Sequence, residues 1–150
     1  MGRREELAIE EHAAWEELST LVRRLSPDQM EIAEVTPDGW SAKDLLFHIG
    51  CWAAEAARQL ERIRMGTYEE RDWDDTDELN ARYLEESRRL DLATVRSELV
   101  AARSRMLEEW SRLGEISADA VEWFEESGPM HLREHTGELR AYVERATAGG

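Results

Sequence analysis

Apolar residues recur every three or four positions along most of this chain, which is the spacing of amphipathic α-helices. The first such run covers residues 7–25 and includes Trp15 and Leu18. The Ser-Pro-Asp sequence at 26–28 ends it, because proline and short polar residues favour a turn over a helix interior. Most of the segment that follows is predicted to be a linker, with a second turn at the Thr-Pro-Asp-Gly sequence of residues 36–39.

A second helix is predicted from its capping signals as well as from its apolar spacing. Ser41 has the character of an N-cap, and Asp44 three residues later completes a capping box. The helix is expected to end near Met65-Gly66, since glycine is the usual residue just past a helix C-terminus. His48 lies one turn after Leu45, so it belongs to the buried stripe of this helix or borders it.

Two further helices follow an acidic loop. A helical region is predicted from about Thr76 to Leu90, and Asp91 then caps a longer helix. That longer helix carries an apolar stripe as far as Leu113, with Gly114 as its C-cap.

The C-terminal part of the chain predicts a last helix that begins at Gly128-Pro129. Residues 117–126 are expected to form only one or two short turns, and proline is favoured in the first turn of a helix. His131, His135 and Leu139 then follow at helical spacing. The two histidines therefore continue an apolar stripe and should point into the protein.

Four apolar stripes of similar length predict an all-α fold, namely a four-helix bundle. The chain has 150 residues, of which 41% are hydrophobic, and this is enough to bury an ordinary core. We therefore expect residues 1–150 to form a single domain.

Charge and cysteine content narrow the class of function. The net charge of −15 argues against nucleic acid as a partner, because phosphates would be repelled, and it disfavours anionic membranes. No stretch approaches the roughly 18 apolar residues of a membrane span, and the N-terminus lacks the apolar region of a secretion signal. The single cysteine, Cys51, cannot form an internal disulfide. We expect a cytoplasmic protein that binds neither nucleic acid nor membrane.

The most informative chemistry lies in three of the four histidines. His131 and His135 are one helical turn apart, so their imidazoles project from the same face. A third imidazole from another helix, His48, would complete the ligand set of an open metal centre. The spacing by itself is weak evidence, and His48 has an ordinary alternative as a core-edge histidine that bonds a backbone carbonyl.

The remaining histidine and the cysteine have two interpretations each. His12 lies on the same helical edge as Trp15, which would allow it to serve a cavity as a catalytic proton shuttle; a half-exposed surface histidine is the plainer interpretation. Cys51 follows His48 by one turn and has the chemistry of a soft ligand or reactive thiol, although a small core residue is the commoner case.

Two carboxylates and two tryptophans complete the candidates. Glu134 and Glu138 are near the histidine pair and could orient a ring nitrogen, although most glutamates of so acidic a chain are simply solvated. Trp52 and Trp73 are candidates for a pocket lining, against core packing for Trp52 and loop anchoring for Trp73.

Three segments, taken in order, resemble the DinB-like superfamily, and most closely the N-terminal domain of the mycothiol-dependent maleylpyruvate isomerases. They are Gly39-Trp40-Ser41-x-x-Asp44-Leu45-x-x-His48-Ile49-x-x-Trp52, then Asp77-Glu78-Leu79-Asn80-Ala81, and finally His131-x-x-x-His135. The resemblance implies a four-helix bundle whose divalent metal is bound by His48, His131 and His135. It also implies a low-molecular-weight thiol, such as mycothiol or bacillithiol, as a cosubstrate, and a homodimer.

The order of the helices stays open at this level. The resemblance implies an up-down-down-up order, in which the helix of His48 and the last helix run in opposite directions. By contrast, all three histidines fall within the first two or so turns of their predicted helices. That placement would bring them level most simply if the two helices began at the same end.

Two functions are therefore expected as alternatives. The first is a metal-dependent enzyme that performs thiol-dependent transferase or isomerase chemistry, or hydrolysis, on a small electrophile. Zn²⁺ is the preferred ion, and Ni²⁺, Fe²⁺ and Mn²⁺ are the other candidates. The second is a non-catalytic bundle that binds or sequesters a small molecule, in which metal is structural or absent.

Overall fold

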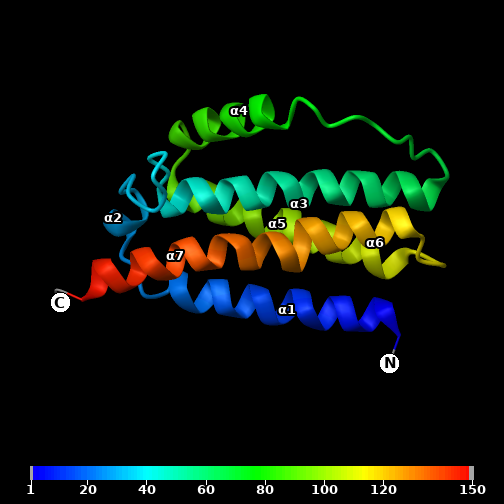
Figure 1. Ribbon diagram of the computed structural model, residues 1–150, viewed down its shortest axis with the longest axis horizontal. Coiled ribbons are helices and arrows are strands. Elements are labelled where there is room, and N and C mark those ends of the chain that lie inside the picture. The colour runs from blue at the N-terminus through cyan, green and yellow to red at the C-terminus, as the bar shows by residue number, and fades with distance from the viewer. Residues whose placement is uncertain (1, 149–150) are drawn as a thin grey trace.

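The computed structural model describes residues 2–148, and every regular element within that range is helical (Figure 1). The prediction of an all-α helical bundle is confirmed. None of the described helices combines the length and the apolar character that a bilayer crossing requires. The elements, in chain order, are α1 (Arg3–Val22), α2 (Pro27–Met30), α3 (Ala42–Met65), α4 (Thr76–Arg88), α5 (Leu92–Arg112), α6 (Ala118–Glu125), the π-helix η1 (Glu126–Met130) and α7 (His131–Thr147).

Most helix boundaries follow from the capping signals of the sequence. The predicted capping box is present at the start of α3, where Ser41 Oγ accepts from the Asp44 backbone N–H and Asp44 accepts from the Ser41 backbone N–H. Gly66 ends that helix with a φ of 76°, a conformation that favours glycine. Asp91 caps α5 by accepting from the Thr94 backbone N–H.

The last helix differs from the prediction. It begins at Ala118, where Ser117 Oγ accepts from the Ala120 backbone N–H, and it continues through η1 into α7 without a break. Gly128-Pro129 therefore lies inside this helical run rather than at its entrance. The wider π-turn explains why, because it accommodates the missing N–H and the ring of Pro129 that an α-helix interior would not.

The long helices run in an up-down-down-up order. In Figure 1, α1 and the α6–η1–α7 run point one way, and α3 and α5 point the other way. The loop after α3 and helix α4 lead the chain back, so that α5 packs against α3 in parallel. The helix order that the sequence left open is thus the antiparallel one for α3 and α7.

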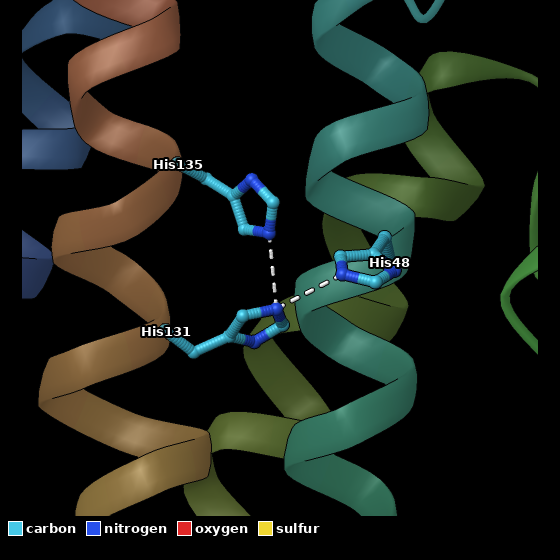
Figure 2. A group of neighbouring side chains, drawn as sticks. All are labelled: His48, His131 and His135. Carbon is cyan, nitrogen blue, oxygen red and sulfur yellow. Dashed lines mark hydrogen bonds between the residues drawn. The ribbon is translucent and has the colours of Figure 1, made fainter. Parts of the chain in front are cut away.

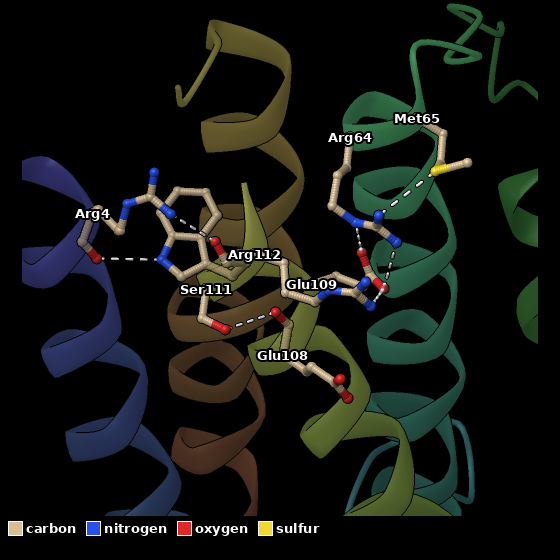
Figure 3. Close-up of polar contacts among 8 residues, drawn as sticks. Arg4, Arg64, Met65, Glu108, Glu109, Ser111 and Arg112 are labelled. Carbon is tan, nitrogen blue, oxygen red and sulfur yellow. Dashed lines mark hydrogen bonds and ion pairs between the residues drawn. The ribbon is translucent and has the colours of Figure 1, made fainter. Parts of the chain in front are cut away.

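Hydrogen bonds hold the end of α5 to its neighbours (Figure 3). The Arg4 guanidinium on α1 donates to the carbonyl of Trp110, and the Trp110 indole N–H donates to the carbonyl of Arg4. On the other side, Arg64 of α3 donates to Glu109 at 2.9 Å. These contacts fix the point from which the chain turns into α6.

The buried apolar residues form two clusters along the bundle. One joins the C-terminal half of α1 and α2 to the start of α3 and to α7, and includes Leu45 and Leu139. The other joins the start of α1 to the second half of α3, to α5 and to α6, and includes Ala53 and Phe124. Along α3 and the last helix, residues of the first cluster flank His48 and His135, whereas His131 lies between Phe124 of the second cluster and Leu132 of the first.

Candidate metal centre

The start of α3, which carries His48, is anchored by buried polar groups. Beyond its capping bond, Asp44 accepts from the hydroxyl of Ser87 on α4 at 2.7 Å. Lys43 is also buried, and its ammonium donates to the carbonyl of Leu90. Because α3 is fixed in this way to α4 and to the start of α5, His48 has a defined position along the bundle.

Three imidazoles meet between α3 and α7 (Figure 2). The Nε2 atom of His131 lies 2.9 Å from Nε2 of His48 and 3.1 Å from Nε2 of His135. All the ligand atoms of this group lie within 4.8 Å of one another. Two neighbouring ligands of a tetrahedral zinc ion would be about 3.4 Å apart, given bonds of about 2.1 Å. The structure therefore brings together the three histidines that the sequence singled out.

Burial keeps two of these imidazoles, those of His48 and His131, neutral. It lowers the pKa of His48 to about 3, with a smaller effect from His135. It also lowers the pKa of His131 to about 2, with smaller effects from His48 and His135. Metal ligation requires neutral imidazoles, because a protonated ring has no free lone pair.

The donor chemistry of the group fits a cation better than hydrogen bonding does. A neutral imidazole has one lone pair and one N–H, so Nε2 of His131 can form only one good hydrogen bond although two nitrogens lie next to it. A divalent cation at the meeting point would accept all three lone pairs. Nδ1 of His48 and Nδ1 of His131 are buried without a hydrogen-bond partner in the described structure.

Glu138 orients the third ring. Nδ1 of His135 lies 2.8 Å from Oε1 of Glu138, one turn further along α7. A carboxylate accepts from Nδ1–H, which leaves the lone pair on Nε2 and fixes the plane of the ring. Glu134, the other carboxylate considered from the sequence, lines the adjoining cavity.

A cavity of about 740 Å³ adjoins the histidines. This volume lies within the usual range for small-molecule sites. The loop between α3 and α4 contributes one wall, and α6, η1 and α7 contribute another. Its lining residues include His48, His131, His135, Trp40, Trp52, Tyr68, Trp73, Asn80, Trp123, Glu122, Glu126, Glu134 and Glu138.

The pocket role considered for Trp52 and Trp73 is the one that the structure shows. Trp123 and Glu126 also line the cavity and were missed, because residues 117–126 were expected to form short turns. A signal for them exists. Ser117 is a suitable N-cap, and cavity-lining positions follow it at helical spacing.

His12 and Cys51 lie outside this cavity. The side chain of His12 is exposed on α1 and is not among the residues that line the cavity. Cys51 is half-buried and packs against the core cluster of Leu45 and Leu139. Burial, with smaller effects from Glu86 and Glu98, raises the pKa of its thiol to about 12, which keeps it in the unreactive protonated form.

A comparison with models of protein families identifies the family of this chain. The model of the DinB superfamily matches residues 12–139, which include all three histidines of the centre. The chain belongs to the DinB superfamily. Comparisons with curated proteins and with solved structures find no match. The superfamily assignment agrees with the helical bundle and with the three-histidine centre, and it leaves the reaction to be inferred from the site.

Proposed function

We propose that this DinB superfamily protein is a divalent-metal-dependent enzyme that acts on a small molecule. The observation that carries the proposal is the convergence of the Nε2 atoms of His48, His131 and His135 beside a cavity of about 740 Å³. Zn²⁺ is the preferred ion for neutral imidazole ligands, and Ni²⁺, Fe²⁺ and Mn²⁺ are the other candidates. When bound, such an ion lowers the pKa of a water or thiol and polarises an electrophilic substrate.

The chain's own residues prepare the site for this chemistry. Glu138 holds the ring of His135 with its Nε2 lone pair free. Aromatic side chains, among them Trp40 and Trp52, line the same cavity as the histidines and give a substrate an apolar surface to contact. Glu134 supplies a carboxylate in the same cavity that is able to accept a proton.

For the reaction, we propose thiol-dependent transfer or isomerisation rather than hydrolysis. The sequence resemblance to mycothiol-dependent maleylpyruvate isomerases supports this choice. A thiol such as mycothiol or bacillithiol would pass its proton to a base such as Glu134 and bond its sulfur to an electrophilic carbon of the substrate. In isomerisation, a π bond of the substrate would open as the sulfur–carbon bond forms and close again as the thiolate leaves. In transfer, a leaving group would depart from the same carbon and take up the proton.

One observation favours the alternative of a non-catalytic, metal-free bundle. The contact of 2.9 Å between His48 and His131 is also a normal length for an N–H···N hydrogen bond. In that case the histidines would stabilise the contact between α3 and α7, and the cavity would bind or sequester a small molecule.

Elemental analysis of the protein purified without added metal separates these functions. The wild-type chain should carry about one divalent ion, since three imidazoles form one site. His48→Ala should lose it, while His12→Ala, which removes an exposed histidine, should retain it. Circular dichroism checks that both variants are folded. Equal metal content in His48→Ala and in the wild type would contradict the site.

A further inference from the structure

Aromatic side chains form one continuous wall of the cavity. The ring of Trp73 lies 5.7 Å from that of Trp52 and 5.4 Å from that of Trp123, both in edge-to-face geometry. The indole N–H of Trp52 donates to Asn80, and that of Trp123 donates to the hydroxyl of Tyr68. Because these two N–H groups are already paired, the wall offers a ligand mainly π surface.

Carboxylates gather beside this wall. Seven acidic residues line the cavity, and five of them lie on the last helical run, where they lead toward the two histidines. They are Asp38, Glu70, Asp119, Glu122, Glu126, Glu134 and Glu138.

Glu122 and Glu126 lie closest in sequence to Trp123. Within residues 2–148, neither forms an ion pair with an arginine or lysine. Glu126 is also crowded by like charge: burial, with smaller effects from Glu122 and Glu125, raises the pKa of its carboxyl. This part of the wall therefore carries negative charge that the described chain does not neutralise.

The same wall already holds a cation of the chain itself. Arg71 is the one lysine or arginine among the lining residues of the described structure. Its guanidinium lies 3.9 Å from the ring centroid of Trp73 and pairs with Asp75 at 2.6 Å. Because Asp75 neutralises it, Arg71 does not pair with Glu122 or Glu126.

From this combination of π surface and unpaired carboxylates we infer that the cavity binds a small organic cation, namely an amine or a quaternary ammonium compound. The cation lies between the aromatic wall of Trp52, Trp73 and Trp123 and the carboxylates of Glu122 and Glu126. Cations are attracted both by aromatic faces and by carboxylates, whereas an anion is repelled and a neutral ligand gains from neither charge term. The inference rests on the proposed function in one respect, since it names the chemical class of the substrate. Glu126 is five residues from His131, about 7 Å along a helix axis, so one small molecule can reach from the carboxylates to the histidines.

Choline and its uncharged isostere, the alcohol with carbon in place of nitrogen, provide matched probes of this site. Calorimetric titration of the wild-type protein should give about tenfold tighter binding of choline than of the alcohol, as expected for a cation against aromatic rings and carboxylates. A carboxylate of similar shape, which carries a tert-butyl group, should bind more weakly than choline or the alcohol. Equal affinity for choline and the alcohol, or a preference for the carboxylate, would overturn the proposal.

Variants locate the binding to this wall. The double change Glu122→Gln and Glu126→Gln should weaken the binding of choline by about fivefold and leave that of the alcohol unchanged, since two exposed carboxylates each contribute little. Glu144→Gln, which removes one charge from an exposed position of α7, is the control for the general acidity of the chain. Trp73→Leu should reduce the preference for choline by about twofold, and Trp73→Phe should retain most of it. An unchanged preference in both the glutamine double variant and Trp73→Leu would place the cation elsewhere and refute the proposal.

The same titration in His48→Ala separates this proposal from the metal function. The cation site does not use the histidines, so choline should still bind more tightly than the alcohol in that variant. A protein that carries no metal and still prefers choline contradicts the proposed function alone. A metal-loaded protein without that preference contradicts the cation site alone.

Discussion

The ring of His135 is held at both of its nitrogen atoms, whereas His48 and His131 are held at Nε2 alone. Nδ1 of His135 is bonded to Glu138, while Nδ1 of each of the other two is buried without a partner in the described structure. A ring with one free rotation can turn its lone pair away from a shared centre. Glu138 therefore has a larger effect on the geometry of the centre than its half-exposed position on α7 suggests.

We predict that Glu138→Ala lowers the affinity for Zn²⁺ by about 10- to 100-fold, the usual effect of removing the partner of a ligating imidazole. Glu138→Gln, which keeps an acceptor oxygen, should lower the affinity for Zn²⁺ by a smaller factor. Competition against a chelator of known affinity measures both. Glu134→Ala is the matched control, because Glu134 lines the same cavity and lies on the same helix without an observed bond to a ring. Equal losses in the two alanine variants would contradict an orienting role for Glu138.

Two of the residue-level predictions came directly from local chemistry. The capping box of Ser41 and Asp44 is a local interaction across three residues, so the sequence contains all of it. The shared face of His131 and His135 follows from helix geometry alone. By contrast, the hydrogen bond between Asp44 and Ser87 joins residues 43 positions apart, so no local sequence pattern predicts it.

At the level of single elements, the π-turn has the largest effect on the site. Gly128-Pro129 has the local propensity of a helix start, but the π-turn keeps the helix continuous from Ala118 to Thr147. His131 and His135 consequently lie in the middle of a long helical run. This placement allows them to meet His48, near the start of α3, although the two helices run in opposite directions.

The close contact of α3 with α5 depends on Gly50. A Cβ atom at this position would lie 3.3 Å from the backbone Cα of Leu99, which cannot move away as a flexible side chain could. We predict that Gly50→Ala destabilises the protein by about 1–3 kcal/mol, because α3 and α5 must separate. Urea unfolding followed by circular dichroism measures the change.

Gly137 on α7 provides the control for that prediction. A Cβ atom there meets no other atom within 4 Å, so Gly137→Ala should only gain helix propensity, about 0.5–1 kcal/mol of stabilisation. A Gly50→Ala variant that is stabilised to the same extent would show that the two helices are not in close contact at this point.

At the scale of the whole molecule, the candidate centre joins parts of the chain that are distant in sequence. His48 and His131 are separated by 83 positions, and they come from different helices, α3 and α7. An ion bound there would cross-link α3 to α7. It would thus stabilise the native state, because the unfolded chain does not hold the three imidazoles together.

Added Zn²⁺ should therefore raise the thermal unfolding temperature of the metal-stripped wild-type protein. At a free concentration of about 100 times the dissociation constant, the linkage contributes about 2.7 kcal/mol. Differential scanning calorimetry with and without Zn²⁺ measures the shift. His131→Ala should show little of it, and a shift of the wild-type size in that variant would mean that the ion stabilises the protein from another site.

The sequence by itself determined the helical class, most helix ends and the common face of His131 and His135, because these depend on interactions within a few residues. The resemblance implied that His48 joins that pair, but only the tertiary structure decided it, since this requires the antiparallel order of α3 and α7 and the continuity of the last helix through η1. The cavity, too, was decided by the tertiary structure. Its aromatic and acidic walls come from α3, the following loop and α6, and packing between distant segments brings them together.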